Sequence, residues 1–284
     1  VCLHLDGRYP VALRAYRFEP GPKALSAKLD FNESPADVPT ETKTAALAAL
    51  GARRFALYPD CGAPRLRAAL AANVGLAPEQ VLPANGSGEA ILAAISVFAG
   101  CGGTLLLAPP VFSLYFQMAA IAGAKVATVP LAGDGFRLDE EAFLAAAARG
   151  ERTVPLLCSP NNPTGGTLSR DFVRRLCAVS GVVLLDQAYV DFAGEDDDLL
   201  PFLPDLPNLV IFRTLSKAYS VAGLRVGFAA ARPDVVVEID KAILPFSVDV
   251  GAEEIALAVL ARRDEVRERC RAIAAERERV AAAL

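Results

Sequence analysis

Short apolar runs alternate with segments of helical composition through the middle of this chain. Between Val81 and Ala230 the pattern predicts about seven strands separated by helices. Such alternation is typical of parallel strands joined by helices that cover both faces of a sheet. We therefore expect an α/β fold with three layers, α/β/α, and a mostly parallel sheet. The runs of strand length that carry this prediction are 81–83, 104–108, 125–129, 154–158, 182–185, 209–212 and 226–230.

The two ends of the chain differ from this central part. Residues 1–28 have no clear period and predict an arm, and a short strand-like piece that runs into a polar turn follows at 29–35. Residues 251–284 carry apolar side chains at helical spacing on an Arg- and Glu-rich background, which predicts one long amphipathic helix. Because the chain starts at Val1 and stops at Leu284 within that helix, we expect a fragment that lacks a small C-terminal domain. The predicted parts are an arm and small-domain lead-in (1–45), a large domain (46–250), and a connecting helix into a truncated small domain (251–284).

The composition argues against several classes of function. A net charge of −4 without any basic block argues against a nucleic-acid partner. The longest apolar stretch, 90–101, is too short to span a bilayer. Scattered cysteines without a CxxC pair favour a reducing, cytoplasmic compartment. His4 is the only histidine, which argues against a Ser-His-Asp triad or a histidine-ligated zinc site. These exclusions favour lysine chemistry.

Lys217 lies in a loop between two apolar runs of strand length, where functional groups are often found. Hydroxyl groups at Thr214 and Ser216 and a cation at Arg225 suit a phosphate, and a lysine beside them suits an imine to an aldehyde. Pyridoxal phosphate (PLP) meets both needs. A lysine taken alone is more often a solvated surface cation, but this spacing favours the cofactor.

A second candidate phosphate contact is the turn Gly86-Ser87-Gly88, between a predicted strand and a predicted helix at 89–99. Free backbone N–H groups and the positive end of a helix dipole attract an anion there. A dinucleotide fingerprint is the alternative, but it needs glycine at position 91, which is Ile91 here. The turn therefore predicts a phosphate cup.

Asp186 follows the most apolar of the predicted strands. A carboxylate at the end of a buried strand needs a partner, because desolvating it unpaired costs several kcal/mol. A protonated pyridine nitrogen is such a partner, and pairing keeps the ring electron-withdrawing. The alternative is that Asp186 caps the following helix.

Two motifs carry a resemblance to a known family. The segment SKAYSVAGLRVGF from Ser216, and PNNPTG from Pro160, resemble the signatures of the class I/II, fold-type I PLP-dependent aminotransferases. The resemblance runs from about residue 29 to the C-terminus and is greatest to histidinol-phosphate aminotransferases. It implies that Lys217 carries PLP, with its pKa lowered by cationic surroundings so that it can move a proton.

The resemblance also assigns roles around the cofactor ring. Asn162 donates to the phenolic oxygen, Tyr189 shares that oxygen, and Phe112 covers the pyridine face. Asn32 borders the substrate. From the residues alone, Phe112 fits a core position equally well and Asn32 fits a turn equally well. The chain has Gly88 and Gln187 where the family usually has Asp and Glu, and we expect both departures to be minor.

Tyr58 is the residue that the resemblance places between subunits. In the family this tyrosine reaches the cofactor phosphate of the neighbouring subunit, which implies a homodimer. Without the family, Tyr58-Pro59-Asp60 is more simply a turn.

The implied activity is transamination of amino-acid and keto-acid substrates, most specifically histidinol phosphate with 2-oxoglutarate in histidine biosynthesis. Threonine-phosphate decarboxylation and aromatic or aspartate transamination are alternatives. A PLP-binding regulatory module would need a DNA-binding appendage, and nothing basic of that kind is present. The arginine that usually binds the substrate carboxylate cannot be assigned here, so we expect these residues alone to bind PLP and turn over slowly.

Overall fold

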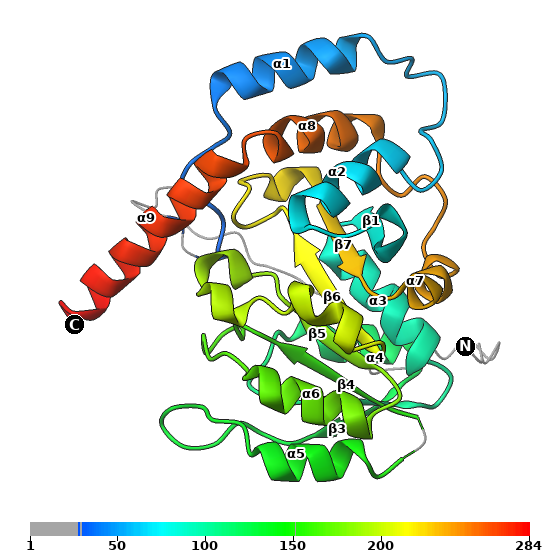
Figure 1. Cartoon of the computed structure of the whole chain (residues 1–284), viewed down its shortest axis with the longest axis vertical. Helices are drawn as coiled ribbons and strands as arrows, with labels where there is room; N and C mark the ends of the chain where they lie inside the picture. Colours follow the sequence, from blue (N-terminus) through cyan, green and yellow to red (C-terminus); the bar gives the residue numbers. More distant parts are fainter. Residues whose placement is uncertain (1–27, 29, 151) are drawn as a thin grey trace, which may run out of the picture.

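A computed structural model describes residues 28, 30–150 and 152–284 (Figure 1). Most of the predicted arm, including Cys2 and His4, lies outside the described residues. The described part contains one sheet in the order β1-β7-β6-β5-β4-β2-β3. Its strands are β1 (Val81–Asn85), β2 (Thr104–Leu107), β3 (Lys125–Thr128), β4 (Thr153–Cys158), β5 (Val183–Asp186), β6 (Leu209–Thr214) and β7 (Val226–Ala230).

The sheet is mostly parallel, as predicted. Strands β3, β2, β4, β5 and β6 pair in parallel, while β7 runs antiparallel to both β6 and β1. In the register, Asp186 lies opposite Cys158 on one side and Phe212 on the other. β4 and β5 therefore end level and β6 continues two residues further, to Thr214, so side chains that follow these strands lie at one edge of the sheet.

Helices cover both faces of the sheet, which gives the predicted three layers (Figure 1). Alternate residues of one strand enter different cores: Leu184 packs into one, and Val183 and Leu185 pack into the other. This period of two is what a strand covered on both faces requires. The helices of the described part are α1 (Thr40–Gly51), α2 (Pro64–Val74), α3 (Ser87–Phe98), α4 (Leu114–Ala122), α5 (Glu140–Ala147), α6 (Arg170–Val179), α7 (Pro233–Asp240), α8 (Val250–Leu260) and α9 (Arg263–Ala281), with short 3-10 turns at Pro78–Gln80, Val190–Phe192, Glu195–Asp197, Leu200–Asp205 and Ala222–Leu224.

The prediction of a single long helix over 251–284 is wrong. The structure has two helices, α8 and α9, and Arg262 between them leaves the helical conformation (φ −111°, ψ 39°). Helix α8 packs on α1 and α2, whereas α9 runs past the 3-10 turn Val190–Phe192 and out of the main body (Figure 1). The break lets each helix bury its apolar side on a different neighbour, and a continuous helical period cannot reveal such a change of direction.

At 29–35 the expected strand is wrong for the described residues 30–35, which form bends and irregular backbone, whereas the expected polar turn agrees with those bends. Asn32 has a left-handed φ of 50°, which interrupts an extended chain. Among the described helices, none is both long and apolar enough to cross a membrane.

Candidate active site

Lys217 lies in the loop that follows β6, and its side chain is half-buried. Its Nζ donates a hydrogen bond to the carbonyl oxygen of Phe31 at 2.8 Å and lies 5.6 Å from the centre of the Tyr189 ring. Burial lowers the pKa of Lys217, with a smaller contribution from Arg225, while Glu33 and Asp186 oppose the shift. The expected direction of this pKa is therefore confirmed, but burial rather than the cationic surroundings is its main cause.

Two amides converge on the Tyr189 hydroxyl. Asn32 Nδ2 donates to it at 3.2 Å, and Asn162 Nδ2 donates at a longer 3.5 Å. Both amides line, with Tyr189 and Lys217, a cavity of about 1100 Å³. The structure thus brings together four residues that are far apart in the sequence and that sequence reasoning assigned to one site.

Asp186 ends β5 and is only 5% exposed. Its Oδ2 accepts a hydrogen bond from the Tyr115 hydroxyl at 2.6 Å, and its Oδ1 accepts one from the backbone N–H of Ala188 at 2.9 Å. Burial raises the pKa of Asp186, and these two hydrogen bonds together with Lys217 oppose the rise. The sequence reasoning required a partner for this carboxylate but missed Tyr115, because nothing local in the sequence links residues 71 positions apart.

The turn before α3 lies against the guanidinium of Arg225. Gly86 has φ 77°, and a Cβ at this position would lie 2.5 Å from Nη2 of Arg225. Arg225 Nη1 also donates to Ser216 Oγ at 3.3 Å. A guanidinium therefore faces the N-terminus of α3, where backbone N–H groups carry partial positive charge, and an anion would satisfy both groups.

Thr214 and Gly88 contribute differently from the other residues that were predicted to contact the phosphate. The Thr214 hydroxyl accepts from the Ser216 backbone N–H at 3.0 Å and donates to the Val226 carbonyl at 3.4 Å, so in this structure it shapes the loop. A Cβ at Gly88 would only make an ordinary contact with Met118. Gln187, the second departure from the family pattern, is fully buried and donates to the Asp197 carbonyl at 2.7 Å, a bond that an amide can make and a carboxylate cannot.

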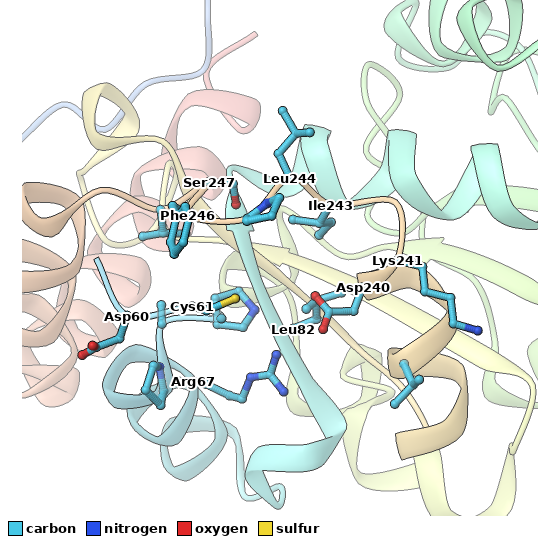
Figure 2. Close-up of a pocket in the computed structure, with 17 residues that line it drawn as sticks. Asp60, Cys61, Arg67, Leu82, Asp240, Lys241, Ile243, Leu244, Phe246 and Ser247 are labelled. Carbon is cyan, nitrogen blue, oxygen red and sulfur yellow. The ribbon is translucent and has the colours of Figure 1, made fainter. Parts of the chain in front are cut away.

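Phe112 and Tyr58 occupy very different surroundings. The half-buried ring of Phe112 meets Tyr115 edge to face, with ring centres 5.5 Å apart. Tyr58 is 83% exposed and stacks on Phe246 at 4.9 Å, and it does not line the cavity of Lys217. Figure 2 shows Phe246 on the wall of a separate cavity of about 530 Å³, beside the turn that contains Cys61.

A segment near the N-terminus crosses over Lys217, and sequence reasoning found only its Asn32. Besides the Phe31 carbonyl, Ser34 accepts a hydrogen bond from Ser220 at 2.8 Å. Arg269 of α9 donates to Ser220 at 2.7 Å and so ties the same loop to the C-terminal helix. These contacts join parts of the chain that are too far apart in sequence for any local pattern to indicate them.

The three groups that PLP requires are present at one edge of the sheet. They are a half-buried amine at Lys217, a buried carboxylate at Asp186 with acceptor capacity left over, and the cationic turn at Gly86. Among the described residues no cluster of His, Cys, Asp or Glu could hold a metal ion. The site therefore fits PLP.

A three-layer α/β fold with this arrangement of lysine, aspartate and cationic turn defines a fold-type I PLP-dependent enzyme. Residues 26–284 match the family described as aminotransferase class I and II, so the chain belongs to that family and is a PLP-dependent aminotransferase.

The most similar relatives share one name. A histidinol-phosphate aminotransferase from Chlorobaculum tepidum is 37% identical over 96% of this chain and 78% of its own length. One from Roseiflexus castenholzii is 40% identical over 90% of this chain and 69% of its own. The solved histidinol-phosphate aminotransferase from Sinorhizobium meliloti, in complex with pyridoxal-5′-phosphate, matches with a TM-score of 0.80 at 28% identity, over 88% of this chain and 68% of that one.

Proposed function

We propose that this aminotransferase exchanges the amino group of histidinol phosphate with 2-oxoglutarate, as a step of histidine biosynthesis. The observation that carries the chemistry is the half-buried Lys217 amine, which lies with Tyr189 and Asn162 on one cavity of about 1100 Å³. The name shared by relatives that are 35–40% identical supports the choice of substrate.

Lys217 is the residue we assign to proton transfer. Its lowered pKa leaves a larger neutral fraction near neutral pH, which a general base requires. Bound PLP supplies an electron sink that stabilises negative charge at the substrate Cα. With PLP bound, Lys217 would remove the proton from the substrate Cα and pass it to the cofactor carbon C4′, which leaves the substrate as the keto acid. Asn162 and Tyr189, which share a hydrogen bond, orient the cofactor and the substrate. Asn32 donates to the Tyr189 hydroxyl and borders the substrate.

Asp186 and the cationic turn hold the two ends of the cofactor in this proposal. Asp186 pairs with the pyridine nitrogen, and Phe112 covers the ring. The phosphate lies between the backbone N–H groups of the turn before α3 and the guanidinium of Arg225. The residues we assign to the phosphate are Gly86, Ser87, Gly88, Thr214, Ser216 and Arg225.

A homodimer in which Tyr58 completes the partner's phosphate site is also part of the proposal. Tyr58 is exposed and held by Phe246 instead of the core, so a neighbouring subunit can reach it. Phe55, Leu57 and Leu244 are likewise large apolar side chains that are more than half exposed. Apolar exposure of this kind is typical of surfaces that meet another subunit.

Two proposals concern the chain as a whole. We assign residues 46–250 to the PLP-binding large domain and 251–284 to the link toward a small domain. We also propose a cytoplasmic location, since Cys61 and Cys101 are exposed free thiols, which persist best in a reducing compartment.

The visible absorbance of the purified chain tests the proposal first. With added PLP, we expect a band from the cofactor joined to Lys217 that borohydride fixes to the protein, and no such band in Lys217→Ala. Absence of the band from a folded wild-type chain would contradict the PLP assignment.

The substrate is tested by a single half-reaction, which needs no turnover. Histidinol phosphate, added without a keto acid, should remove the band at lower concentration than aspartate or an aromatic amino acid does. A preference for either of those amino acids, or release of CO₂ from threonine phosphate, would overturn the substrate assignment. A stable band with no response to any amino acid would instead favour a regulatory role.

A further inference from the structure

We infer that Tyr115 is a positioning residue, which holds the Asp186 carboxylate ionised and correctly turned toward the cofactor's pyridine nitrogen. This inference rests on the proposed role of Asp186. Tyr115 is fully buried on α4, and its hydroxyl lies 2.6 Å from Asp186 Oδ2. No sequence motif pointed to this tyrosine.

The direction of the hydrogen bond is fixed by where the proton resides. Burial and the negative charge of Asp186 raise the pKa of Tyr115 well above its usual value, so the phenol stays protonated and donates. Asp186 is then the acceptor, and a donated hydrogen bond favours its charged form. An uncharged Asp186 would be a poor partner for a pyridinium.

The two hydrogen bonds of Asp186 also fix its orientation. Tyr115 holds Oδ2 and the Ala188 N–H holds Oδ1, so the carboxylate plane cannot turn without losing one of them. Each carboxylate oxygen can accept more than one hydrogen bond, which leaves capacity for the cofactor. The titratable groups around the carboxylate come from four places: Tyr115 on α4, Cys158 on β4, Tyr189 after β5 and Lys217 after β6.

Tyr115 also connects the two groups that we place against the cofactor ring. Its ring meets Phe112 edge to face, three residues earlier at the entrance to the same helix. One buried side chain therefore supports both the ring stack and the carboxylate. Removing only the hydroxyl separates these contributions, because phenylalanine keeps the contact with Phe112.

The test measures PLP affinity and the pH at which the absorbance of the bound cofactor changes, in wild type and Tyr115→Phe. We expect PLP binding to weaken about tenfold, which corresponds to loss of one hydrogen bond to a charged group. We also expect the pH midpoint to move upward, because a less firmly protonated ring withdraws fewer electrons from the nitrogen attached to Lys217. Unchanged affinity and midpoint in a folded Tyr115→Phe variant would overturn the inference.

Tyr219→Phe is the matched control for stability. Tyr219 is also buried, and its hydroxyl accepts from Asn73 at 2.7 Å. It should lose a similar amount of thermal stability while leaving the pH midpoint in place. If both variants shift the midpoint equally, the effect is structural and the inference fails.

A double-mutant cycle with Asp186→Asn separates this inference from the proposed function. If Asp186→Asn alone leaves PLP binding and the midpoint unchanged, the role proposed for Asp186 is wrong, and the inference fails with it. If Asp186→Asn shifts both and Tyr115→Phe shifts neither, only the inference fails. If the inference holds, Tyr115→Phe adds nothing in the Asp186→Asn background. If Tyr115→Phe folds only when Asp186→Asn is also present, the result supports the inference, because the single variant then leaves the buried Asp186 charge without its hydrogen-bond donor. If Tyr115→Phe folds neither alone nor with Asp186→Asn, the inference is contradicted.

Discussion

At the scale of single residues, burial shifts the two main titratable groups of the site in opposite directions for one reason. A low-dielectric environment penalises charge, so it lowers the pKa of Lys217 and raises that of Asp186. Hydrogen bonds from Tyr115 and Ala188 compensate Asp186, which supports its ionised form. The negative charge of Glu33 is the main influence that opposes the lowered pKa of Lys217, and the effect of burial is larger.

Gly86 provides a prediction at this scale. A methyl group there would meet Nη2 of Arg225 at 2.5 Å, and the backbone conformation (φ 77°, ψ 159°) is one that other residues avoid. We expect Gly86→Ala to lower the free energy of unfolding by about 1–3 kcal/mol and to weaken PLP binding, because Arg225 must move away from the turn. Absorbance titration with PLP and chemical denaturation measure the two effects.

Gly75 is the matched control for this change. It also has a positive φ, of 74°, but nothing lies within 4 Å of a Cβ built there. Gly75→Ala should therefore cost about 1 kcal/mol of stability and leave PLP affinity unchanged. Equal PLP affinities in the two variants would show that Arg225 is not held against the turn for a ligand.

The residues that could be predicted from the sequence are those whose chemical role is indicated by their immediate neighbours in the sequence. Lys217, Asp186 and Asn162 each follow a recognisable strand, so their common edge of the sheet was predictable from the topology rule alone. Tyr115, Ser34 and Arg269 act through contacts with residues distant in sequence, and a single sequence contains no signal for such pairs.

At the scale of elements, an ionic cluster fastens α1 and α2 to α8. Glu254 of α8 accepts from Arg53, just after α1, at 2.7 Å and from Arg65 of α2 at 2.6 Å, and Glu253 lies beside it. Both glutamates are buried, while Arg65 remains half exposed. The cluster positions α1 and α2, which follow the segment over Lys217 in the chain.

Glu254→Gln should destabilise the chain by about 2 kcal/mol, which is less than breaking a fully buried pair costs, because Arg65 reaches solvent. The pKa of Glu254 is lowered chiefly by the hydrogen bond from Arg65. A carboxyl group whose pKa is lowered by folding stabilises the folded state when the pH is above its usual pKa of 4.5. This stabilisation is lost as the pH falls through the lowered pKa. The difference between wild type and variant should therefore be full at pH 7 and disappear in acid, as measured by denaturation at each pH.

Glu276→Gln on α9 serves as the comparison. Glu276 pairs with Arg279 on an exposed surface, and surface pairs contribute little. If Glu254→Gln cost no more than Glu276→Gln at pH 7, the cluster would not be what fastens these helices.

The bounds of most strands and helices could be predicted from the sequence, but the direction of one strand and the break between two helices could not. Short apolar runs predicted the strands and segments of helical composition predicted most helices, and β7 was predicted with its observed bounds. The direction of β7 was not predictable, because a strand buried on both faces has the same apolar pattern whether it runs parallel or antiparallel to its neighbours. The break at Arg262 was hidden for a similar reason, since the apolar period continues across it.

At the scale of the whole molecule, the proposed homodimer distributes each active site over two chains. Lys217 and Arg225 would come from one subunit and Tyr58 from its partner. A closed twofold dimer has one self-complementary interface that contains two equivalent shared sites, so two defective chains can combine to form one intact site. This property distinguishes a crossing tyrosine from one that acts within its own chain.

We predict that mixing the Lys217→Ala and Tyr58→Ala chains restores tight PLP sites. In a mixed dimer, the chain that keeps Lys217 receives Tyr58 from its partner, so one of the two sites is complete. Random mixing should give about one complete site in four, counted from the Lys217-linked absorbance at limiting PLP. Lys217→Ala mixed with Gly86→Ala is the control, because both of those residues belong to the same side of the site and no combination of subunits restores it. Recovery in the control, or none in the test mixture despite exchange of subunits, would show that Tyr58 does not cross between chains. The stacking of Tyr58 on Phe246 supports crossing, since it holds the ring on the outer surface, where another chain can meet it.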